Sequence, residues 1–244
     1  MISRVHRLFV PPEQLGGSAR VKLRPAQSRH LVTVLRLSSG AEIEVFDGRG
    51  GRFRAHLSDD ALEIGPPLPG DARAVDVVLA QALAKGEKMD LVVQKAVELG
   101  ASRVVPFASE RAVPRLDARR GTSRAERWRR IAQEAARQSG RADVPQVDAP
   151  IGWEELFSLA HAEPDRRPLL LDPDERELRL GAASSGVSRL LLVVGPEGGF
   201  SPEERQRAVS SGFLPVALGP FVLRTETSGL AALAVVMHVH GALG

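Results

Sequence analysis

Hydrophobic and polar positions change their spacing near residue 72 of this 244-residue chain. Before that point, apolar residues alternate with polar ones over short stretches, which predicts strands with one buried face. The expected strands are residues 7–10, 42–46, 52–57 and 61–64, with a short helix at 28–35. Asp47–Gly51 (DGRGG) supplies a hairpin turn between two of them. Residues 1–72 therefore predict a small β-rich domain that ends in the linker Gly65–Asp71 (GPPLPGD).

From residue 73 onward, continuous apolar runs alternate with segments of helical spacing. A strand that is apolar throughout is typical of a parallel sheet buried on both faces. The expected strands are 75–80, 103–107, 169–171, 190–194 and 213–218, and the expected helices are 88–99, 124–139, 203–211 and 228–240. Residues 145–186 carry few signals, so we expect them to be loop-rich. The alternation predicts an α/β domain over residues 73–244, with helices flanking a parallel sheet.

Two loops rich in glycine and proline stand out in the second domain. Leu190–Glu204 (LLLVVGPEGGFSPEE) contains an apolar strand, a loop and the start of a helix. Pro202 suits the first helical position, and Ser201 and Glu204 have the spacing of a capping box. A similar loop lies within Ala217–Gly229 (ALGPFVLRTETSG). Since ligands bind at the carboxyl edge of such sheets, the two loops are predicted to flank one cleft.

Acidic residues in the first loop narrow the choice of ligand. Glu197, Glu203 and Glu204 would repel a polyphosphate. The chain also lacks the GxxxxGK[ST] and GxGxxG motifs. A neutral or cationic ligand held by backbone groups, such as an adenosine carrying a sulfonium, fits better. The alternative for the first loop alone is a tight structural turn.

Composition excludes several classes of site. The chain has no cysteine, so it has no disulfide, no thiolate metal site and no cysteine nucleophile. The six histidines form no HExxH or H-x-E pattern, and we predict no metal. The longest apolar run, Leu230–Met237, is far shorter than the roughly 20 residues that span a bilayer. The N-terminus has no apolar signal-peptide core. We therefore expect a cytoplasmic protein without a membrane segment.

Positive charge is concentrated in one segment although the net charge is only +3. Residues 103–141 contain 11 arginines and 4 acidic residues. Such a segment indicates nucleic-acid binding, and the alternative is a solvated helix face. Tyrosine is absent and aromatic residues make up 4% of the chain. An aromatic platform of the kind found in RNA recognition motifs is therefore not expected.

The two loop motifs, GPEGGFSPEE followed by LGPFVLRTETSGLAAL, resemble those of the bacterial 16S ribosomal RNA uridine-N3 methyltransferase family. The resemblance continues over residues 81–100, 127–141, 5–10 and 30–48, and so covers most of the chain. It implies a C-terminal trefoil-knotted, SPOUT-type parallel sheet in residues 73–244. It also implies a PUA-like β-barrel that binds RNA in residues 1–72. S-adenosylmethionine is the implied cofactor, and 16S rRNA of the small ribosomal subunit and a second copy of the chain are the implied partners.

The resemblance also assigns roles to residues. The predicted cofactor-binding residues are Leu171, Asp172, Gly195, Pro196, Glu197, Gly198, Gly199, Leu218, Gly219, Pro220, Leu223 and Thr225. The residues predicted to contact RNA are Arg4, Arg7, Arg36, Arg129, Arg130 and Arg141. Arg224 is expected to stabilise negative charge on the uracil or to position a phosphate, or alternatively to form a local ion pair with Glu226. Phe221 stands where relatives often carry a basic residue.

The implied reaction transfers a methyl group to N3 of a uridine, whose base must be unpaired because N3 lies on the Watson–Crick edge. The N3 proton must leave, and Glu226 or Glu197 are the candidate acceptors. Either carboxylate would need a pKa raised by burial to act as a base. Two alternatives stay open. One is a SPOUT methyltransferase acting on a ribose 2′-hydroxyl or on tRNA, and the other is a non-catalytic RNA-binding ribosome-assembly protein.

Overall fold

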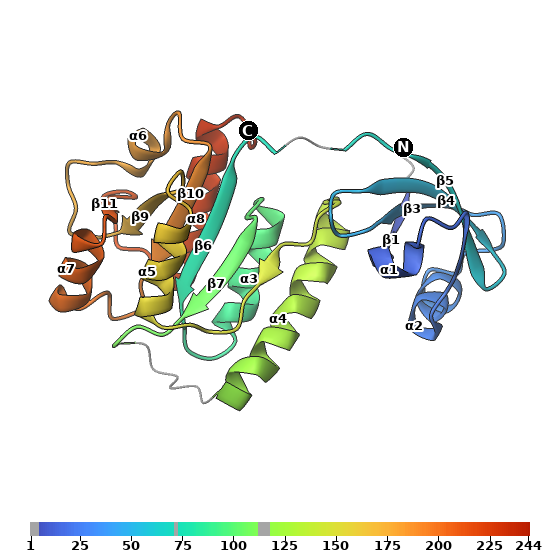
Figure 1. The fold of residues 1–244 in the computed structure, drawn as a ribbon, viewed down its shortest axis with the longest axis horizontal. Coiled ribbons are helices and arrows are strands. Elements are labelled where there is room, and N and C mark those ends of the chain that lie inside the picture. Colours follow the sequence, from blue (N-terminus) through green and yellow to red (C-terminus); the bar gives the residue numbers. More distant parts are fainter. Residues whose placement is uncertain (1–4, 71–72, 112–117) are drawn as a thin grey trace. The chain divides into compact units, whose positions relative to one another are not determined.

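The computed structural model of the protein describes residues 5–70, 73–111 and 118–244, which form two compact units (Figure 1). Unit 1 comprises Met1–Ala72 together with Ala136–Val144, and unit 2 comprises Arg73–Ala135 and Pro145–Gly244. The second segment of unit 1 lies within the part of the chain that the sequence division at residue 72 gave to the second domain.

Unit 1 is built on a five-stranded sheet with the order β1-β3-β4-β5-β2. The strands are β1 (His6–Phe9), β2 (Arg20–Lys22), β3 (Glu42–Phe46), β4 (Arg52–Ser58) and β5 (Ala61–Pro67). The predicted hairpin turn joins β3 to β4, where the Asp47 carboxylate accepts hydrogen bonds from the N–H groups of Arg49 and Gly51. One face of the sheet buries Ile43, Val45 and Leu57, which are fully or almost fully enclosed. The alternating pattern thus predicted four of the five strands.

Short helical segments accompany this sheet. They are α1 (Pro12–Leu15), α2 (Pro25–Ser28) and a π-helical turn at Arg29–Val34. No hydrogen-bonded pairing joins β1 to β2 among the described strands, so the ladder itself is an open sheet. Instead, the Gln27 amide donates to the Phe9 carbonyl oxygen, and the Gln14 amide donates to both Gln27 and the Lys22 carbonyl oxygen. Two glutamine side chains therefore bridge the gap that strand pairing would fill in a closed barrel.

Arg7 explains why residues 136–144 belong to unit 1. Its guanidinium donates to the carbonyl oxygens of Ala136, Arg137 and Arg141, and it forms an ion pair with Glu44 at 2.8 Å. The carbonyl groups at a helix end have no partner within the helix, and a cation is stabilising there. Arg7 was predicted to contact RNA, but its side chain is largely buried in these internal contacts.

Unit 2 contains a six-stranded, wholly parallel sheet with the order β11-β9-β10-β6-β7-β8 (Figure 1). The strands are β6 (Asp76–Ala82), β7 (Arg103–Phe107), β8 (Gln146–Val147), β9 (Arg167–Leu171), β10 (Arg189–Val194) and β11 (Leu214–Val216). The helices are α3 (Lys88–Glu98), α4 (Ala118–Ser139), α5 (Trp153–Ala162), α6 (Leu180–Ser184), α7 (Pro202–Ser210) and α8 (Thr225–Val239). The α/β fold class with a parallel sheet and flanking helices is confirmed.

Both faces of this sheet are covered, as the apolar strands require. On one face, Val78 and Val193 belong to a core with Trp153 and Phe157 of α5 and Ala208 of α7. On the other face, α8 packs on β6 and β10 and against α3. A Cβ atom added to Gly229 of α8 would lie only 2.8 Å from Oε1 of Gln81 in β6 and 3.5 Å from a side-chain atom of Val194 in β10. Because Gly229 has no side chain, α8 approaches the sheet closely, and this positions its N-terminus beside the end of β10.

The expectation of a loop-rich segment at residues 145–186 is wrong. This segment holds α5, β8 and α6. Trp153, Leu156, Phe157 and Ala160 have helical spacing and are buried, and Glu155 accepts a hydrogen bond from the Gly152 N–H at the start of α5. Helix α4 also begins at Ala118, six residues before the predicted start.

Among the described helices, none is long and apolar enough to cross a membrane. The described residues also contain no group of three or more His, Asp or Glu side chains arranged to hold a metal ion. The trefoil knot stays a prediction from the resemblance, because strand order alone does not establish how the chain is threaded.

Candidate active site

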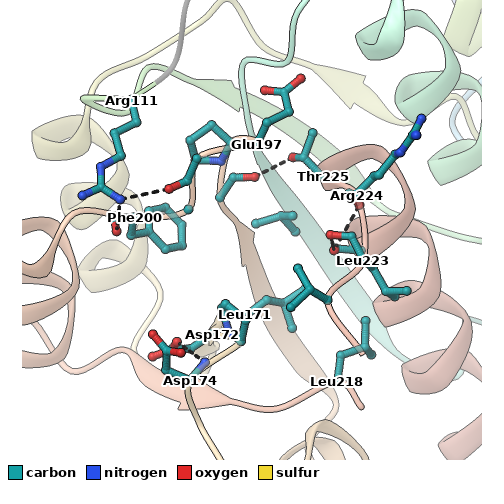
Figure 2. Close-up of a pocket in the computed structure, with 18 of the residues that line it drawn as sticks. Arg111, Leu171, Asp172, Asp174, Glu197, Phe200, Leu218, Leu223, Arg224 and Thr225 are labelled. Carbon is teal, nitrogen blue, oxygen red and sulfur yellow. Dashed lines mark hydrogen bonds between the residues drawn. The ribbon is translucent and has the colours of Figure 1, made fainter. Parts of the chain in front are cut away.

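Three loops leave the sheet at one edge and line a common pocket (Figure 2). They follow β9, β10 and β11, which are neighbours in the parallel sheet, so their carboxyl ends lie together. The pocket has a volume of about 660 Å³. This lies within the range of about 300–1,000 Å³ that is usual for small-molecule sites.

The structure brings almost all of the predicted cofactor-binding residues to this pocket. The predicted residues that line it are Leu171, Asp172, Gly195, Pro196, Glu197, Gly198, Gly199, Leu218, Gly219, Leu223 and Thr225. Pro220 does not line the pocket, and neither does Glu226, whereas Arg224 does. In the view of Figure 2, Leu171, Leu218 and Leu223 lie on the side of the pocket away from Arg111. Placement in the pocket does not test the role of any of these residues, and their roles stay predictions.

The loop after β10, Gly195–Ser201, is held by its own helix. The Ser201 hydroxyl accepts a hydrogen bond from the Glu204 N–H, and the Glu204 carboxylate accepts one from the Ser201 N–H, which confirms the capping box. Gly199 has a φ of +66°, a conformation that side chains other than glycine rarely adopt. Its N–H donates to the Pro196 carbonyl oxygen and closes a turn.

Glu204 does not face a ligand, although the sequence analysis counted its charge against polyphosphate binding. Its side chain is 1% exposed and accepts hydrogen bonds from the Trp153 indole at 2.6 Å and the Glu110 N–H at 2.7 Å. The carboxylate therefore ties the loop to α5 and to the end of β7. Of the three acidic residues considered, only Glu197 lines the pocket.

Thr225 joins the loop after β10 to the start of α8. Its hydroxyl donates to the Gly195 carbonyl oxygen at 2.5 Å and accepts from the Gln81 amide at 2.9 Å. Thr225 and Gln81 are both buried. The side-chain hydroxyl predicted to bind cofactor is thus used within the protein, where it fixes the distance between the two pocket loops (Figure 2).

Lys88, at the start of α3, connects the same two elements through charge. Its ammonium lies 3.0 Å from Glu197 and 3.1 Å from Glu226. Burial raises the pKa of Glu197, but hydrogen bonds from Lys88 and from backbone N–H groups outweigh it, so the pKa lies below the ordinary value. Burial also raises the pKa of Glu226, and its own N–H and Lys88 reverse the direction in the same way. The hydrogen bonds that the Lys88 ammonium donates to both carboxylates raise the pKa of Lys88.

These pKa directions are opposite to those required of a general base. A carboxylate with a lowered pKa accepts a proton poorly at neutral pH. Glu197 and Glu226 were candidates for removing the N3 proton. The structure instead gives them a salt-bridged, positioning arrangement with Lys88, because the cation stabilises their ionised forms.

Arg111 holds the outer side of the loop after β10. Its guanidinium donates to the Gly198 carbonyl oxygen at 2.9 Å and to the Phe200 carbonyl oxygen at 3.3 Å (Figure 2). Both carbonyl oxygens are therefore already bound by Arg111, which itself lines the pocket. A third cation, Arg205 of α7, pairs with Asp172 at 2.5 Å, and the other oxygen of Asp172 accepts from the Asp174 N–H.

Arg224 is the residue that precedes α8, and its side chain is exposed at the pocket. No described residue forms a hydrogen bond or ion pair with its guanidinium, because Glu226 is paired with Lys88 instead. The alternative of a local Arg224–Glu226 ion pair is therefore not what the structure has. This arginine is available to a ligand.

The predicted RNA contacts fall into different environments. Arg4 lies outside the described residues. Arg36, Arg129 and Arg130 are exposed, and Arg129 donates to the Val147 carbonyl oxygen. Arg141 pairs with Asp143 at 2.6 Å. Acidic partners such as Asp148 and Asp90, which pair with Arg103 and Arg127, neutralise part of the basic segment.

Four site residues were missed by sequence reasoning, namely Gln81, Lys88, Arg111 and Arg205. A polar residue at the end of a strand was the available signal for Gln81 and Arg111, since β6 and β7 end at the same sheet edge as the pocket strands. Lys88 and Arg205 lie on helices among other charged residues, where the sequence offers no such signal.

Comparison with known proteins agrees with this geometry. The RNA methyltransferase domain family matches residues 71–237, and the RNA methyltransferase PUA domain family matches residues 23–64. A ribosomal RNA small subunit methyltransferase E from Synechocystis is 36% identical over 94% of this chain and 76% of its own length. The chain belongs to the ribosomal RNA small subunit methyltransferase E family.

Solved structures extend the likeness from the sequence to the fold. The small subunit methyltransferase E from Neisseria gonorrhoeae, in a crystal structure bound to S-adenosyl methionine, has a TM-score of 0.86 and 32% identity. The similarity covers 96% of this chain and 97% of that one. A methyltransferase from Legionella pneumophila with the same cofactor has a TM-score of 0.84 and 31% identity over 96% and 98% of the two chains. The N-terminal unit is accordingly a PUA domain and the second unit a methyltransferase domain.

Proposed function

We propose that this methyltransferase transfers a methyl group from S-adenosylmethionine to N3 of a uridine in the 16S rRNA of the small ribosomal subunit. The observation that carries the proposal is the meeting of both loop motifs in one pocket, fixed by the hydrogen bond from Thr225 to Gly195. The names of the relatives support the substrate class.

The residues of the pocket fit this cofactor. Leu171, Leu218 and Leu223 offer apolar surface on which a flat adenine ring can pack. Glu197 places a carboxylate at the same pocket, which favours a cationic sulfonium over an anion. The bound cofactor supplies the methyl group that is transferred.

Arg224 is the residue that we assign to the target base. N3 of uridine carries a hydrogen and becomes nucleophilic when that proton leaves. The resulting negative charge spreads over the two neighbouring carbonyl oxygens of the ring. A guanidinium directed at those oxygens stabilises the charge as it develops. The Arg224 side chain is exposed at the pocket and has no described hydrogen-bond or ion-pair partner there.

The N3 proton, in this proposal, passes to water rather than to a carboxylate of the protein. Lys88 keeps Glu197 and Glu226 ionised and in place, so their contribution is to hold the loop after β10 against α8. The positive charge of Arg224 then favours the deprotonated base.

We also propose that the protein acts as a homodimer in the cytoplasm, where its substrate is found. Helix α8 supports the dimer, because its apolar residues Leu230, Ala231 and Ala234 are only half-buried in one copy of the chain. Light scattering on the purified protein tests this: the mass of two chains supports it, and the mass of one chain contradicts it.

Methyl transfer tests the proposed function. Small ribosomal subunits that lack the native modification are incubated with the protein and labelled S-adenosylmethionine, and their nucleosides are separated. The proposal predicts labelled N3-methyluridine. A methylated ribose would assign the protein to a different methyl transfer. Absence of transfer together with absence of cofactor binding would favour the non-catalytic RNA-binding alternative.

A further inference from the structure

One aromatic side chain is exposed in a protein that buries the others. All ten aromatic residues lie in the described part of the chain. Nine of them are buried or partly buried, and most of these pack on one another. Phe221 is 81% exposed. An exposed phenylalanine side chain lacks the stabilising free energy that burial would provide. Its exposure therefore indicates that the side chain is covered by a binding partner.

The place of Phe221 indicates what that partner is. It lines the proposed active-site pocket, on the loop between β11 and α8 that also carries Leu223 and Arg224. The ring therefore lies at the pocket, three residues before the arginine that faces the target base in the proposed reaction.

The charges around the pocket favour a nucleotide over an apolar protein surface. Arg224 lines the same pocket as Phe221 and has no described hydrogen-bond or ion-pair partner, whereas the other two arginines of the pocket are already paired within the protein. A nucleotide presents a flat π-face for an aromatic ring and oxygens for guanidinium groups. An apolar protein surface would cover Arg224 without giving its charge a partner, which is costly.

We propose that Phe221 is the stacking surface for the target nucleobase, an inference that rests on the proposed function. A base taken out of a helix loses the stacking of its neighbours. The ring of Phe221 replaces that stacking on one face while the N3 edge points into the pocket toward Arg224. Stacking recognises a base only when it is unpaired and accessible, so Phe221 selects for an extruded nucleotide rather than for a sequence.

Two substitutions of Phe221 separate the aromatic ring from apolar bulk. Phe221→Leu keeps an apolar side chain without a ring, and Phe221→Trp keeps a ring. Val209→Ala is the control, because Val209 is an exposed apolar residue of α7 that does not line the pocket. Methyl transfer to unmodified small subunits, binding of those subunits and binding of S-adenosylmethionine are measured for all three variants.

Phe221→Leu is expected to lower kcat/KM for the subunits about tenfold or more, as removal of an aromatic–base stack does. Phe221→Trp and Val209→Ala stay near the unmodified protein, and cofactor affinity is unchanged throughout. Equal activity of Phe221→Leu and Val209→Ala overturns the proposal while leaving the methyl transfer in place. Loss in both Phe221 variants together with a fall in oligomeric mass also overturns it, and assigns the ring to contact with a second copy.

The proposed function fails separately, when the unmodified protein makes no N3-methyluridine. Subunit binding then still decides the role of Phe221. Weaker binding by Phe221→Leu than by Phe221→Trp supports stacking, and equal binding by the two variants contradicts it.

Discussion

The two loops that form the pocket are held in opposite ways. Loop Gly195–Ser201 is fastened on every side, by the capping box of α7, by Arg111, by Thr225 and by Lys88. Loop Ala217–Leu223 leads through Arg224 to the buried Thr225 at the start of α8, but it exposes Phe221 and Val222. A fastened loop suits a cofactor of constant shape, and an exposed loop suits a substrate that arrives as part of a large RNA. One pocket therefore combines a preformed half, the loop Gly195–Ser201, with an open half, the loop Ala217–Leu223 and Arg224.

The largest expected effect comes from a substitution in the open half of the pocket. Arg224→Ala is predicted to lower kcat for methyl transfer by about 10²–10³-fold, as loss of a donor to a developing oxyanion does. Single-turnover transfer to unmodified subunits measures it. Arg176→Ala is the control, since Arg176 is exposed and does not line the pocket. A loss no greater than that of the control would remove Arg224 from the chemistry.

The second-largest expected effect comes from removing the hydrogen bonds of Thr225 that connect the two pocket loops. Thr225→Val keeps the shape of the side chain but leaves the Gln81 amide and the Gly195 carbonyl oxygen buried without their partner. Each buried group left unpaired costs about 1–3 kcal/mol, so the free energy of unfolding should fall by roughly 2–6 kcal/mol. Urea unfolding measures it. Thr227→Val, at an exposed site on the same helix, is expected to change little, and equal effects of the two would contradict the account.

A smaller effect concerns pH and the charges that fasten the first loop. The pKa values of Glu197 and Glu226 lie below their ordinary 4.5 in the folded protein. Their contribution to stability is therefore present above that pH and lost as the pH falls through the lowered values. Lys88→Ala removes the cation that lowers both pKa values, so stability above about pH 4.5 should fall and the acid limb should shift to a shallower slope.

Urea midpoints measured over roughly pH 3–6 test this shift. Lys95→Ala is the control, because Lys95 pairs with Glu98 on the same helix rather than with either loop. An acid limb that is the same in Lys88→Ala and the unmodified protein would show that Lys88 does not hold these carboxylates.

The sequence predicted those features of the pocket whose interacting residues lie close together along the chain. Ser201 and Glu204 are three residues apart, and their capping box was evident from spacing. The pocket strands and the hairpin at Asp47 were predicted for the same reason, since each depends on a local pattern. Lys88 and Glu226 are far apart in the sequence, so only the fold brings them together.

Helix α5 shows a second limit. Trp153, Leu156 and Phe157 have helical spacing, but Pro145, Pro150 and Pro164 surround them and favoured a loop. All three prolines lie outside α5, which runs from Trp153 to Ala162, so they do not interrupt the helix. The internal contacts of Arg7 were not predicted for the first reason, because its partners at the end of α4 are more than 120 residues away.

The smallest expected effect comes from a substitution on α4, outside both pocket loops. Arg130 is exposed on α4, and its side chain donates only to the Glu126 carbonyl oxygen among the described contacts. Arg130→Glu is predicted to weaken subunit binding and to reduce its salt slope by about 1, the value for one lost phosphate contact. Binding measured at several salt concentrations tests this, and an unchanged slope removes α4 from the RNA surface.

The affinity for S-adenosylmethionine of Arg111→Ala and Arg224→Ala, measured by titration calorimetry, tests the division between the two halves most directly. The account predicts that Arg111→Ala raises the Kd about tenfold, because it frees two carbonyl groups of the fastened loop. Arg224→Ala should leave the Kd within about threefold of its original value. A Kd that rises with Arg224→Ala and not with Arg111→Ala would contradict the division.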